Sequence, residues 1–321
     1  MNSMDRCLVP GSNVLQHTIC LALLAIVACG DGSSAYRPTA ATAPSTDIFL
    51  GRLQRDGSRL AVSELMNVTD REGYDNQPHF LSDGNAFLYT SARDTFQTDI
   101  YRYDLSSGSV TRVTRTASAS EYSPTVMPAG DAFSVIREDG TIQQLWRYSL
   151  EGEDRGGLLD ALQPVGYHAW GDETTVAVFI VGDSLTPSRL VLADVVTGDT
   201  TRIAENIGRS LHRIPGRHAV SFVQKTAEED EGDWLIKALD LDTRSVSAIA
   251  PTLPGREDYV WLPDGSILMG DDSELHRWTA ARGWELVADL SGSGVRGITR
   301  LAVSPAAERI AVVAERGAAD E

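Results

Sequence analysis

Short runs of apolar residues, or of apolar and polar residues in alternation, recur along the chain from residue 86 to its C-terminal end. The runs are AFLYTSA (86–92), AFSVIRE (132–138), TVAVFIVG (175–182), AVSFVQK (219–225), SILMGDD (266–272) and RIAVVAE (309–315). β-Branched and aromatic residues dominate them, and Gly, Asp and Ser separate them, which is the pattern of strands joined by tight turns. No segment after residue 46 shows a sustained helical period. We therefore predict an all-β fold.

The strands are arranged in a repeat. Turn signals recur at residues 82, 128, 171, 215, 263 and 304, and successive signals are separated by 46, 43, 44, 48 and 41 residues. After each turn comes the apolar run, then a further strand such as DIYRYDL (99–105), and then a short outer strand such as SVTRVT (109–114). A period of about 40–50 residues with four short strands is typical of β-propeller blades.

The two ends of the repeat complement each other. The C-terminal unit contains only two strands, ITRLAV (298–303) and RIAVVAE (309–315). Two unassigned strands, DIFLGRL (47–53) and RLAVSELMNVT (59–69), stand before the first complete unit. Pairing them with the C-terminal strands completes a sixth blade and removes two open sheet edges. We predict a six-bladed β-propeller over residues 47–315, with four-stranded antiparallel blades, the last closed by N- and C-terminal strands, and a C-terminal tail at 316–321.

The N-terminal segment has the layout of a secretory signal. Residues 18–28, TICLALLAIVA, form an apolar run that is too short to span a bilayer and that ends in small residues. The sequence Ile26-Val27-Ala28-Cys29 resembles the bacterial lipobox, in which the cysteine is acylated. We predict a lipoprotein signal peptide at 1–28, lipid attachment at Cys29 and a flexible Gly/Ser/Ala/Thr/Pro-rich tether at 29–46. A plain signal peptide with an incidental cysteine is the alternative.

One repeat resembles those of a known family. The run QPHFLSDG (77–84), followed by Tyr89, Ser91 and DIY (99–101), is similar to a TolB-type propeller repeat, also called the PD40 or WD40-like bacterial repeat. The segments from Ser123 to Gly130 and from Trp261 to Gly265 match the same strand and turn. The resemblance implies the propeller fold and specifies function far less. Members of the TolB type carry an α/β domain before the propeller, and only the tether stands at that place here.

Charge and cysteine content narrow the functional classes. Asp and Glu number 45 against 28 Lys and Arg, a net charge of −17. Such a field repels nucleic acid and anionic membrane surfaces, so nucleic-acid binding is excluded. All three cysteines, Cys7, Cys20 and Cys29, lie at or before the lipobox. The propeller is therefore predicted to hold no disulfide and no cysteine-based zinc site.

Histidines provide the sharpest candidate site. His79, His168 and His212 fall in predicted innermost strands, just before the recurrent turn, where they could converge on a metal or an anion at the channel. However, His168 aligns with His79 only if Trp170 is left out of the aromatic position that Phe80 and Trp261 occupy. In addition, His79 and His212 belong to opposite blades. Solvated or hydrogen-bonded channel histidines are the alternative.

We conclude from the sequence that the chain is a binding or scaffold propeller, secreted and lipid-anchored in the bacterial cell envelope, on the periplasmic or outer-membrane face. A protein partner is favoured, and a glycan or peptide stays open. No cofactor or bound metal is expected. Catalysis is not expected either, because no G-x-S-x-G motif of a hydrolase occurs. The ligand is predicted to contact one channel mouth near His79 or His212. The alternative is a metal-dependent polysaccharide lyase or hydrolase that uses the channel histidines.

Overall fold

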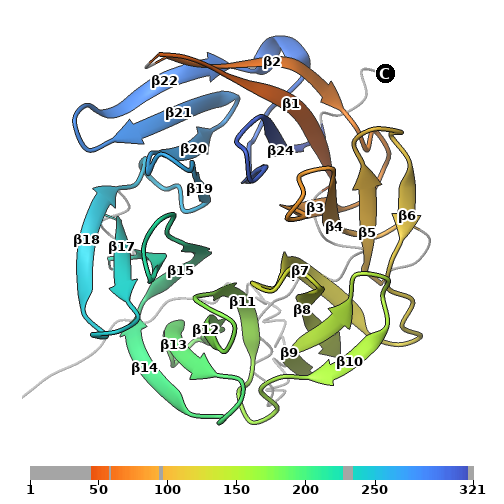
Figure 1. Cartoon of the computed structure of the whole chain (residues 1–321), viewed down its shortest axis with the longest axis vertical. Helices are drawn as coiled ribbons and strands as arrows, with labels where there is room; N and C mark the ends of the chain where they lie inside the picture. The colour runs from red at the N-terminus through yellow and green to blue at the C-terminus, as the bar shows by residue number, and fades with distance from the viewer. Residues whose placement is uncertain (1–44, 58, 94–96, 227–233, 317–321) are drawn as a thin grey trace, which may run out of the picture. The chain divides into compact units, whose positions relative to one another are not determined.

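The computed structural model describes residues 45–57, 59–93, 97–226 and 234–316. Within them the chain forms six four-stranded antiparallel sheets arranged in a ring, and a single short 3-10 turn at Ser291–Ser293. This confirms the predicted six-bladed β-propeller (Figure 1). Cys29, the signal peptide 1–28 and the tether up to residue 44 lie outside the described residues, so their predictions stay untested. In the described part, no helix is long and apolar enough to cross a membrane.

Blades 1 to 5 are built outward from the ring axis, and the innermost strand of each is the first in sequence. Blade 1 consists of β3 (Asp75–Phe80), β4 (Ala86–Ser91), β5 (Asp99–Asp104) and β6 (Val110–Arg112). Blade 2 consists of β7 (Ser120–Val126), β8 (Ala132–Asp139), β9 (Ile142–Ser149) and β10 (Asp154–Gly157). Blade 3 consists of β11 (Val165–Trp170), β12 (Thr175–Ile180), β13 (Arg189–Asp194) and β14 (Thr200–Glu205).

The next two blades repeat this order. Blade 4 consists of β15 (Ile207–Arg213), β16 (Ala219–Gln224), β17 (Leu235–Asp240) and β18 (Val246–Pro251). Blade 5 consists of β19 (Tyr259–Trp261), β20 (Ile267–Asp271), β21 (Glu274–Thr279) and β22 (Gly283–Asp289).

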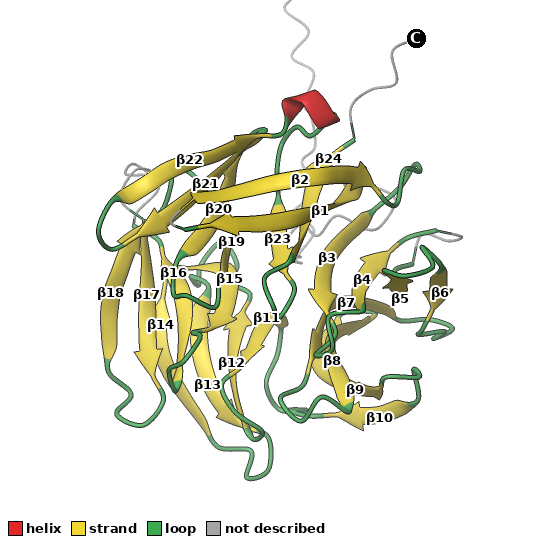
Figure 2. Cartoon of the chain, turned by 45° about the horizontal axis from the view of Figure 1, so that its top comes forward, coloured by secondary structure: helices red, strands yellow, loops and turns green. Residues whose placement is uncertain are grey.

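Blade 6 joins the two ends of the propeller. Its strand order is β2 (Arg59–Asn67), β1 (Thr46–Asp56), β24 (Arg309–Glu315) and β23 (Arg300–Val303). The register of β1 against β24 runs from Thr46 opposite Glu315 to Arg52 opposite Arg309, and Figure 2 shows the four strands side by side. The predicted closure is confirmed. The first strand begins one residue before the predicted boundary, at Thr46.

The core lies between blades rather than within any one of them. Leu88 of blade 1 packs with Phe133 of blade 2, and Leu192 of blade 3 packs with Phe222 of blade 4. Ile48 of blade 6 is fully buried in one cluster with residues of blade 1. Because each sheet removes its apolar face from water only against its neighbours, the closed ring is required for stability. The ring in turn fixes the innermost strands around one channel.

Candidate functional site

The channel contains two cavities. The larger, about 640 Å³, lies where the innermost strands begin, and we call it the wide mouth. The smaller, about 320 Å³, lies where these strands end, and we call it the narrow mouth. Gln77, Tyr167, Arg209 and Arg300 line both cavities and therefore stand between them. The wide mouth is also lined by Thr46, Tyr74, Asn76, Tyr122, Ile136, Glu138, Phe179, Val181, Ile207, Lys225 and Glu257, among others.

One register position of the innermost strands supplies much of the wide mouth. Asn76, Tyr122, Tyr167 and Arg300 pair with Thr90, Ile136, Phe179 and Val313 respectively. Each partner is the fifth residue of its second strand. The four residues are therefore equivalent in the repeat, and the fold brings them to one level of the channel. Polar and aromatic side chains at this level face one another across the axis.

A layer of ion pairs divides the two cavities. Asp258 accepts from Arg209 Nη2 at 2.6 Å and from Arg300 Nη1 at 2.9 Å, and Arg300 Nη2 donates to Tyr167 Oη at 3.0 Å. Burial opposes the ionisation of Asp258, but the two guanidiniums outweigh it and hold the pKa of this carboxyl below its ordinary value. Burial also opposes the charge on Arg209, and Asp258 raises its pKa nonetheless. Side chains of blades 3, 4, 5 and 6 thus join at the channel centre.

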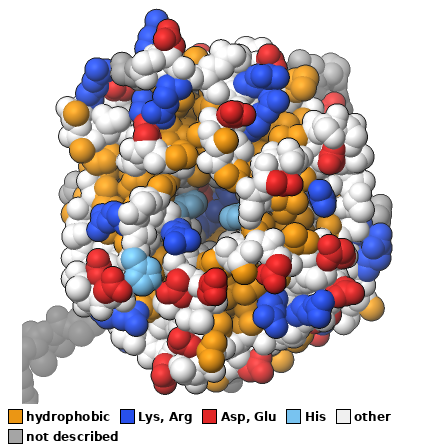
Figure 3. Space-filling model, in the orientation of Figure 1, with side chains coloured by type: hydrophobic (Ala, Val, Ile, Leu, Met, Phe, Trp, Pro, Cys, Tyr) orange, Lys and Arg blue, Asp and Glu red, His pale blue; other side chains and the backbone are white. Residues whose placement is uncertain are grey.

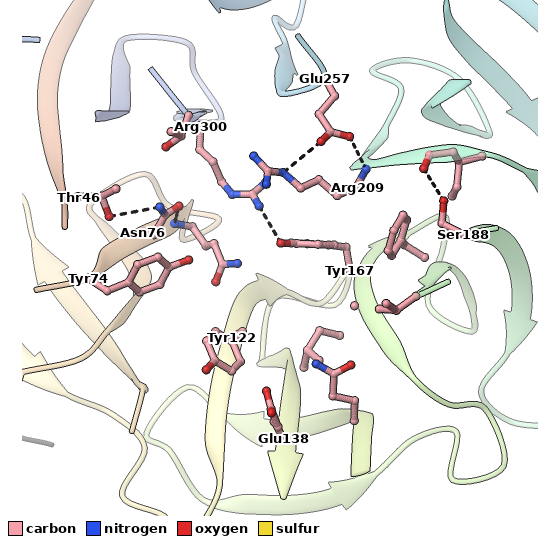
Figure 4. Close-up of a pocket in the computed structure, with 18 of the residues that line it drawn as sticks. Thr46, Tyr74, Asn76, Tyr122, Glu138, Tyr167, Ser188, Arg209, Glu257 and Arg300 are labelled. Atoms are coloured by element: carbon pink, nitrogen blue, oxygen red, sulfur yellow. Dashed lines mark hydrogen bonds and ion pairs between the residues drawn. The ribbon is translucent and has the colours of Figure 1, made fainter. Parts of the chain in front are cut away.

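The layer extends into the wide mouth through Glu257. Its carboxylate accepts from the Arg209 backbone N–H at 2.9 Å, and Lys225 Nζ lies 3.1 Å from it. In this connected group Arg209, Lys225 and Arg300 share two carboxylates, Asp258 and Glu257. Figure 4 shows Arg209 and Arg300 reaching the middle of the cavity from opposite sides, with the Tyr167 hydroxyl hydrogen-bonded to Arg300. This connected group at the floor of the wide mouth holds three cations and two carboxylates, and Glu138 and Glu315 also line the cavity.

The walls of the wide mouth are aromatic and aliphatic. The phenol of Tyr74 points into the cavity in Figure 4. Burial raises the pKa of Tyr74, so the hydroxyl stays protonated and can donate a hydrogen bond. Ile136 and Ile207 are 1% and 2% exposed, and Phe179 is half-buried. Apolar walls around a few polar groups are the usual design of ligand pockets.

His79 and His212 line the narrow mouth at equivalent positions. His79 pairs with Leu88 and His212 with Ser221, each the third residue of its second strand. Burial lowers the pKa of both imidazoles to about 4, so both are neutral at neutral pH. The His212 ring meets Tyr259 edge-on at 4.7 Å, and its Nε2 lies 3.0 Å from Ser210 Oγ. Figure 3 shows histidine side chains at the wall of the central hollow and a Lys or Arg side chain deeper within it.

His168 is one residue out of register with these two. It pairs with Val178, the fourth residue of its second strand, whereas Trp170 takes the aromatic position. The alternative alignment that keeps Trp170 in that position is therefore confirmed. His168 is only 6% exposed, its Nε2 lies 2.6 Å from Ser134 Oγ of blade 2, and Trp170 Nε1 donates to the same oxygen at 2.9 Å. Burial, with a smaller contribution from His79, lowers the pKa of His168 to about 3.

The same arrangement recurs between blades 4 and 5. Tyr259 Oη and Trp261 Nε1 both donate to Ser221 Oγ at 2.8 Å. Ser221 and Ser134 are equivalent in the repeat, since each is the third residue of its second strand. We call these two groups the serine clamps. His168 thus stands where Tyr259 stands in the other clamp, which gives it a packing role between blades.

The histidines do not assemble with other ligands in the described part of the chain. Among those residues, no group of three or more His, Cys, Asp or Glu side chains is placed to hold a metal ion. The narrow mouth offers His79 and His212 together with Arg209, Arg300 and Asp258. The arrangement is suited to hydrogen bonding and to charge recognition. Whether a ligand contacts the histidines stays a prediction.

Sequence reasoning located the channel but missed the wide mouth. The residues it did not single out are Tyr74, Tyr122, Tyr167, Arg209, Asp258 and Arg300. Their signal is the repeat itself, aligned at the start of the innermost strand instead of at the turn that ends it. At that level, bulges between Asn76 and His79 and between Tyr122 and Thr125 shift the register. A count of residues back from the turn therefore does not identify the equivalents.

Fold and site define a six-bladed propeller whose channel is divided by a buried layer of arginine and aspartate. No family model matches the sequence, and no curated protein matches it in sequence. Among solved structures the chain is similar to a protein from Agrobacterium tumefaciens described as "putative TolB", with a TM-score of 0.66 and 15% identity over 86% of this chain and 100% of that one. The expected TolB-type architecture is thus confirmed at the level of the fold.

Other solved propellers resemble the chain less. An oligogalacturonate lyase in complex with manganese has a TM-score of 0.50 and 15% identity, over 81% of this chain and 76% of that one. TolB from Acinetobacter baumannii has a TM-score of 0.49 and 19% identity, over 64% of this chain and 52% of that one. At these identities the comparisons show the shared fold, and function must be argued from the site.

Proposed function

We propose that the chain is a lipid-anchored binding module of the bacterial cell envelope that takes up a segment of a protein partner in the wide mouth. The observation that carries this proposal is the cavity of about 640 Å³, with aromatic and aliphatic walls and a charged floor. A pocket of this size and lining can enclose a few amino-acid residues of a partner, whereas a flat protein surface could not enter it. The fold supplies the rigid frame, and the loops between blades vary around it.

The predicted lipid anchor on Cys29 would be joined to the propeller on the same side of the ring as the wide mouth. Thr46, the first strand residue, lines the wide mouth, and its Oγ1 donates to the Asp75 carbonyl at 2.9 Å. Arg316 directly follows the last strand of the propeller, and its backbone N–H donates to the Ser45 carbonyl at 3.0 Å. A lipid on Cys29 would therefore be joined to the propeller at the rim of the wide mouth. A partner in or near the membrane would meet this mouth first.

A photo-crosslinking experiment tests the proposal. p-Benzoylphenylalanine is placed at Tyr122 in the wide mouth, at His79 in the narrow mouth, and at Val246 on the outermost strand of blade 4, which is 41% exposed. After irradiation of cells, we expect a defined adduct with one envelope protein from position 122 and none from 246. An adduct from 79 alone would place the ligand at the histidines. Adducts from 246 alone would refute a channel site.

The enzymatic alternative is tested with the same protein. Purified full-length chain is incubated with oligogalacturonate and Mn²⁺, and unsaturated products are followed by ultraviolet absorbance. We expect no product above the level of the His79→Ala/His212→Ala variant. Turnover that this double substitution abolishes would favour the lyase alternative, because the variant removes the histidine ligands and leaves the wide mouth intact.

A further inference from the structure

The floor of the wide mouth presents more hydrogen-bond donors than the protein itself uses. A guanidinium has five N–H donors, and within the described residues the Arg300 side chain spends two, one on Asp258 and one on Tyr167. The side chain of Arg209 donates hydrogen bonds from Nε and Nη2 to the Asp258 carboxylate. Tyr74 adds a protonated phenol, and the charges of Arg300 and Arg209 both act on it. Donors from Arg209 of blade 4, from Arg300 of blade 6 and from Tyr74, directly before blade 1, thus converge on one space.

The ion-paired group at this floor carries one positive charge more than its negative charges, although Glu138 and Glu315 also line the cavity. Three cations share two carboxylates here, whereas the protein carries a net charge of −17. Arg300 and Asp258 side chains are each 16% exposed, so solvent screens the floor less than it screens the surface. Guanidinium groups bind carboxylates through paired N–H···O bonds. One further carboxylate would neutralise the group.

Accessible apolar surface lies in the same cavity, on the side of blade 3. Phe179 and Val181 are half-buried and line the wide mouth together with Arg209 and Arg300. A ligand that fills both parts must carry a carboxylate close to an apolar group. In a peptide, a C-terminal apolar residue satisfies this requirement, and an Asp or Glu side chain next to an apolar residue does so as well.

We propose that the wide mouth recognises a peptide carboxylate, held by Arg300 and Arg209 with the Tyr74 hydroxyl, while a neighbouring apolar side chain packs on Phe179 and Val181. The proposal rests on the proposed function, because it names the chemistry of the segment that the wide mouth binds. Asp258 occupies the narrow-mouth side of the two guanidiniums, so the peptide carboxylate approaches from the other side. The ion-pair layer acts as a preformed receptor that requires no rearrangement.

A peptide-pool experiment tests this recognition. The immobilised folded protein is offered a random hexapeptide pool with free C-termini and, separately, the same pool with amidated C-termini, and retained peptides are identified by mass spectrometry. We expect retention of free-acid peptides with apolar last residues at least tenfold above the amidated pool. If the carboxylate comes from a side chain, the amidated pool is instead retained with Asp or Glu enriched at one position.

Matched variants locate the effect. Arg300→Gln removes a cation but leaves Asp258 paired with Arg209, so the layer keeps a buried ion pair. Arg52→Gln removes an exposed pair with Glu64 on blade 6 and is the control. We expect Arg300→Gln to reduce retention at least tenfold and Arg52→Gln to leave it unchanged. Both variants should show wild-type circular dichroism and cooperative melting.

Three outcomes would overturn the carboxylate proposal: equal retention of both pools with no acidic enrichment, retention unaffected by Arg300→Gln, or no retention from either pool. The crosslinking at position 122 separates these from failure of the proposed function. An adduct at 122 without any carboxylate preference would leave the wide mouth as the binding site and reject the ligand chemistry. Absence of the adduct would reject the binding site itself.

Discussion

Arg300 donates a hydrogen bond of 3.0 Å to the phenol oxygen of Tyr167, a residue 133 positions earlier in the chain and in the opposite blade. The guanidinium carbon also lies 4.9 Å from the centre of the Tyr167 ring. This contact crosses the propeller axis. Together with the pairs of Asp258 to Arg209 and Arg300, it separates the wide mouth from the narrow mouth.

The crossing contact can be measured by a double-mutant cycle. Tyr167→Phe removes the acceptor, and Arg300→Met removes the donor. We expect Tyr167→Phe to lower the free energy of unfolding by about 0.5–1.5 kcal/mol, the usual net value of a hydrogen bond. The two effects should be coupled by a similar amount in chemical denaturation. Additive effects would show that the two side chains do not interact in solution.

The serine clamps should contribute to stability equally, since they are equivalent in the repeat. Ser134→Ala leaves the buried Trp170 N–H without its acceptor, and Ser221→Ala removes the acceptor of the buried Tyr259 hydroxyl and of the half-buried Trp261 N–H. We expect each to cost about 1–3 kcal/mol, the penalty for an unsatisfied buried polar group. Ser245→Ala, in an exposed outer turn, is the control and should change stability by less than about 0.5 kcal/mol. Losses no larger than the control's would remove the clamps as stabilising elements.

Glu121 should make the fold less stable at high pH. Its carboxyl is fully buried and accepts from Thr114 at 3.0 Å and Tyr148 at 3.3 Å. Burial raises its pKa from 4.5 to about 7. The unfolded chain therefore releases this proton first, and stability is lost as pH rises from 4.5 to 7. By the size of the shift, the loss is about 3 kcal/mol.

Glu121→Gln tests this dependence because glutamine carries no titrating proton. We expect the melting temperature of the variant, compared with wild type, to rise between pH 5 and pH 8. All other titrating groups are common to both proteins and cancel in the comparison. A constant difference across this range would show that Glu121 titrates at its ordinary pKa in the fold.

The histidine prediction from the sequence is tested by His79→Ala combined with His212→Ala. Neither imidazole carries an inter-blade clamp, so the double variant should fold, and we expect weaker ligand capture in a pull-down from solubilised envelope. Both pKa values are lowered to about 4, so wild type should lose stability as pH falls from 6.5 toward 4, and the variant should lose less. Unchanged capture by the folded variant would remove the histidines from the site.

Lipid attachment is tested by Cys29→Ser. The change removes the acylated thiol, and several acyl chains contribute about 0.8 kcal/mol per buried methylene. We expect the variant to leave the membrane fraction for the soluble fraction while the propeller melts as in wild type. Equal membrane retention of both proteins would show that the anchor lies elsewhere.

The fold and its closure can be predicted from the periodic pattern of the chain. Alternating strands, the 41–48-residue spacing of the turns and the two half-units at 47–69 and 298–315 require a ring, since open sheet edges are otherwise left unpaired. It also placed His79 and His212 in equivalent positions, because both precede a turn of regular length and no bulge intervenes. Such features are local or periodic, so they can be recognised in the amino-acid sequence alone.

The contents of the channel, in contrast, depend on contacts that form only in the folded molecule. His168 lies one residue out of register because Trp170 fills the aromatic position between blades. The imidazole of His168 instead contacts Ser134 in a serine clamp. Tyr167, Asp258 and Arg300 come from three blades and meet at the axis, where no spacing in the sequence records their distance. Strand bulges further change which side chain reaches this level. The ring is encoded by periodicity, and the site by the convergence of non-equivalent residues that periodicity does not describe.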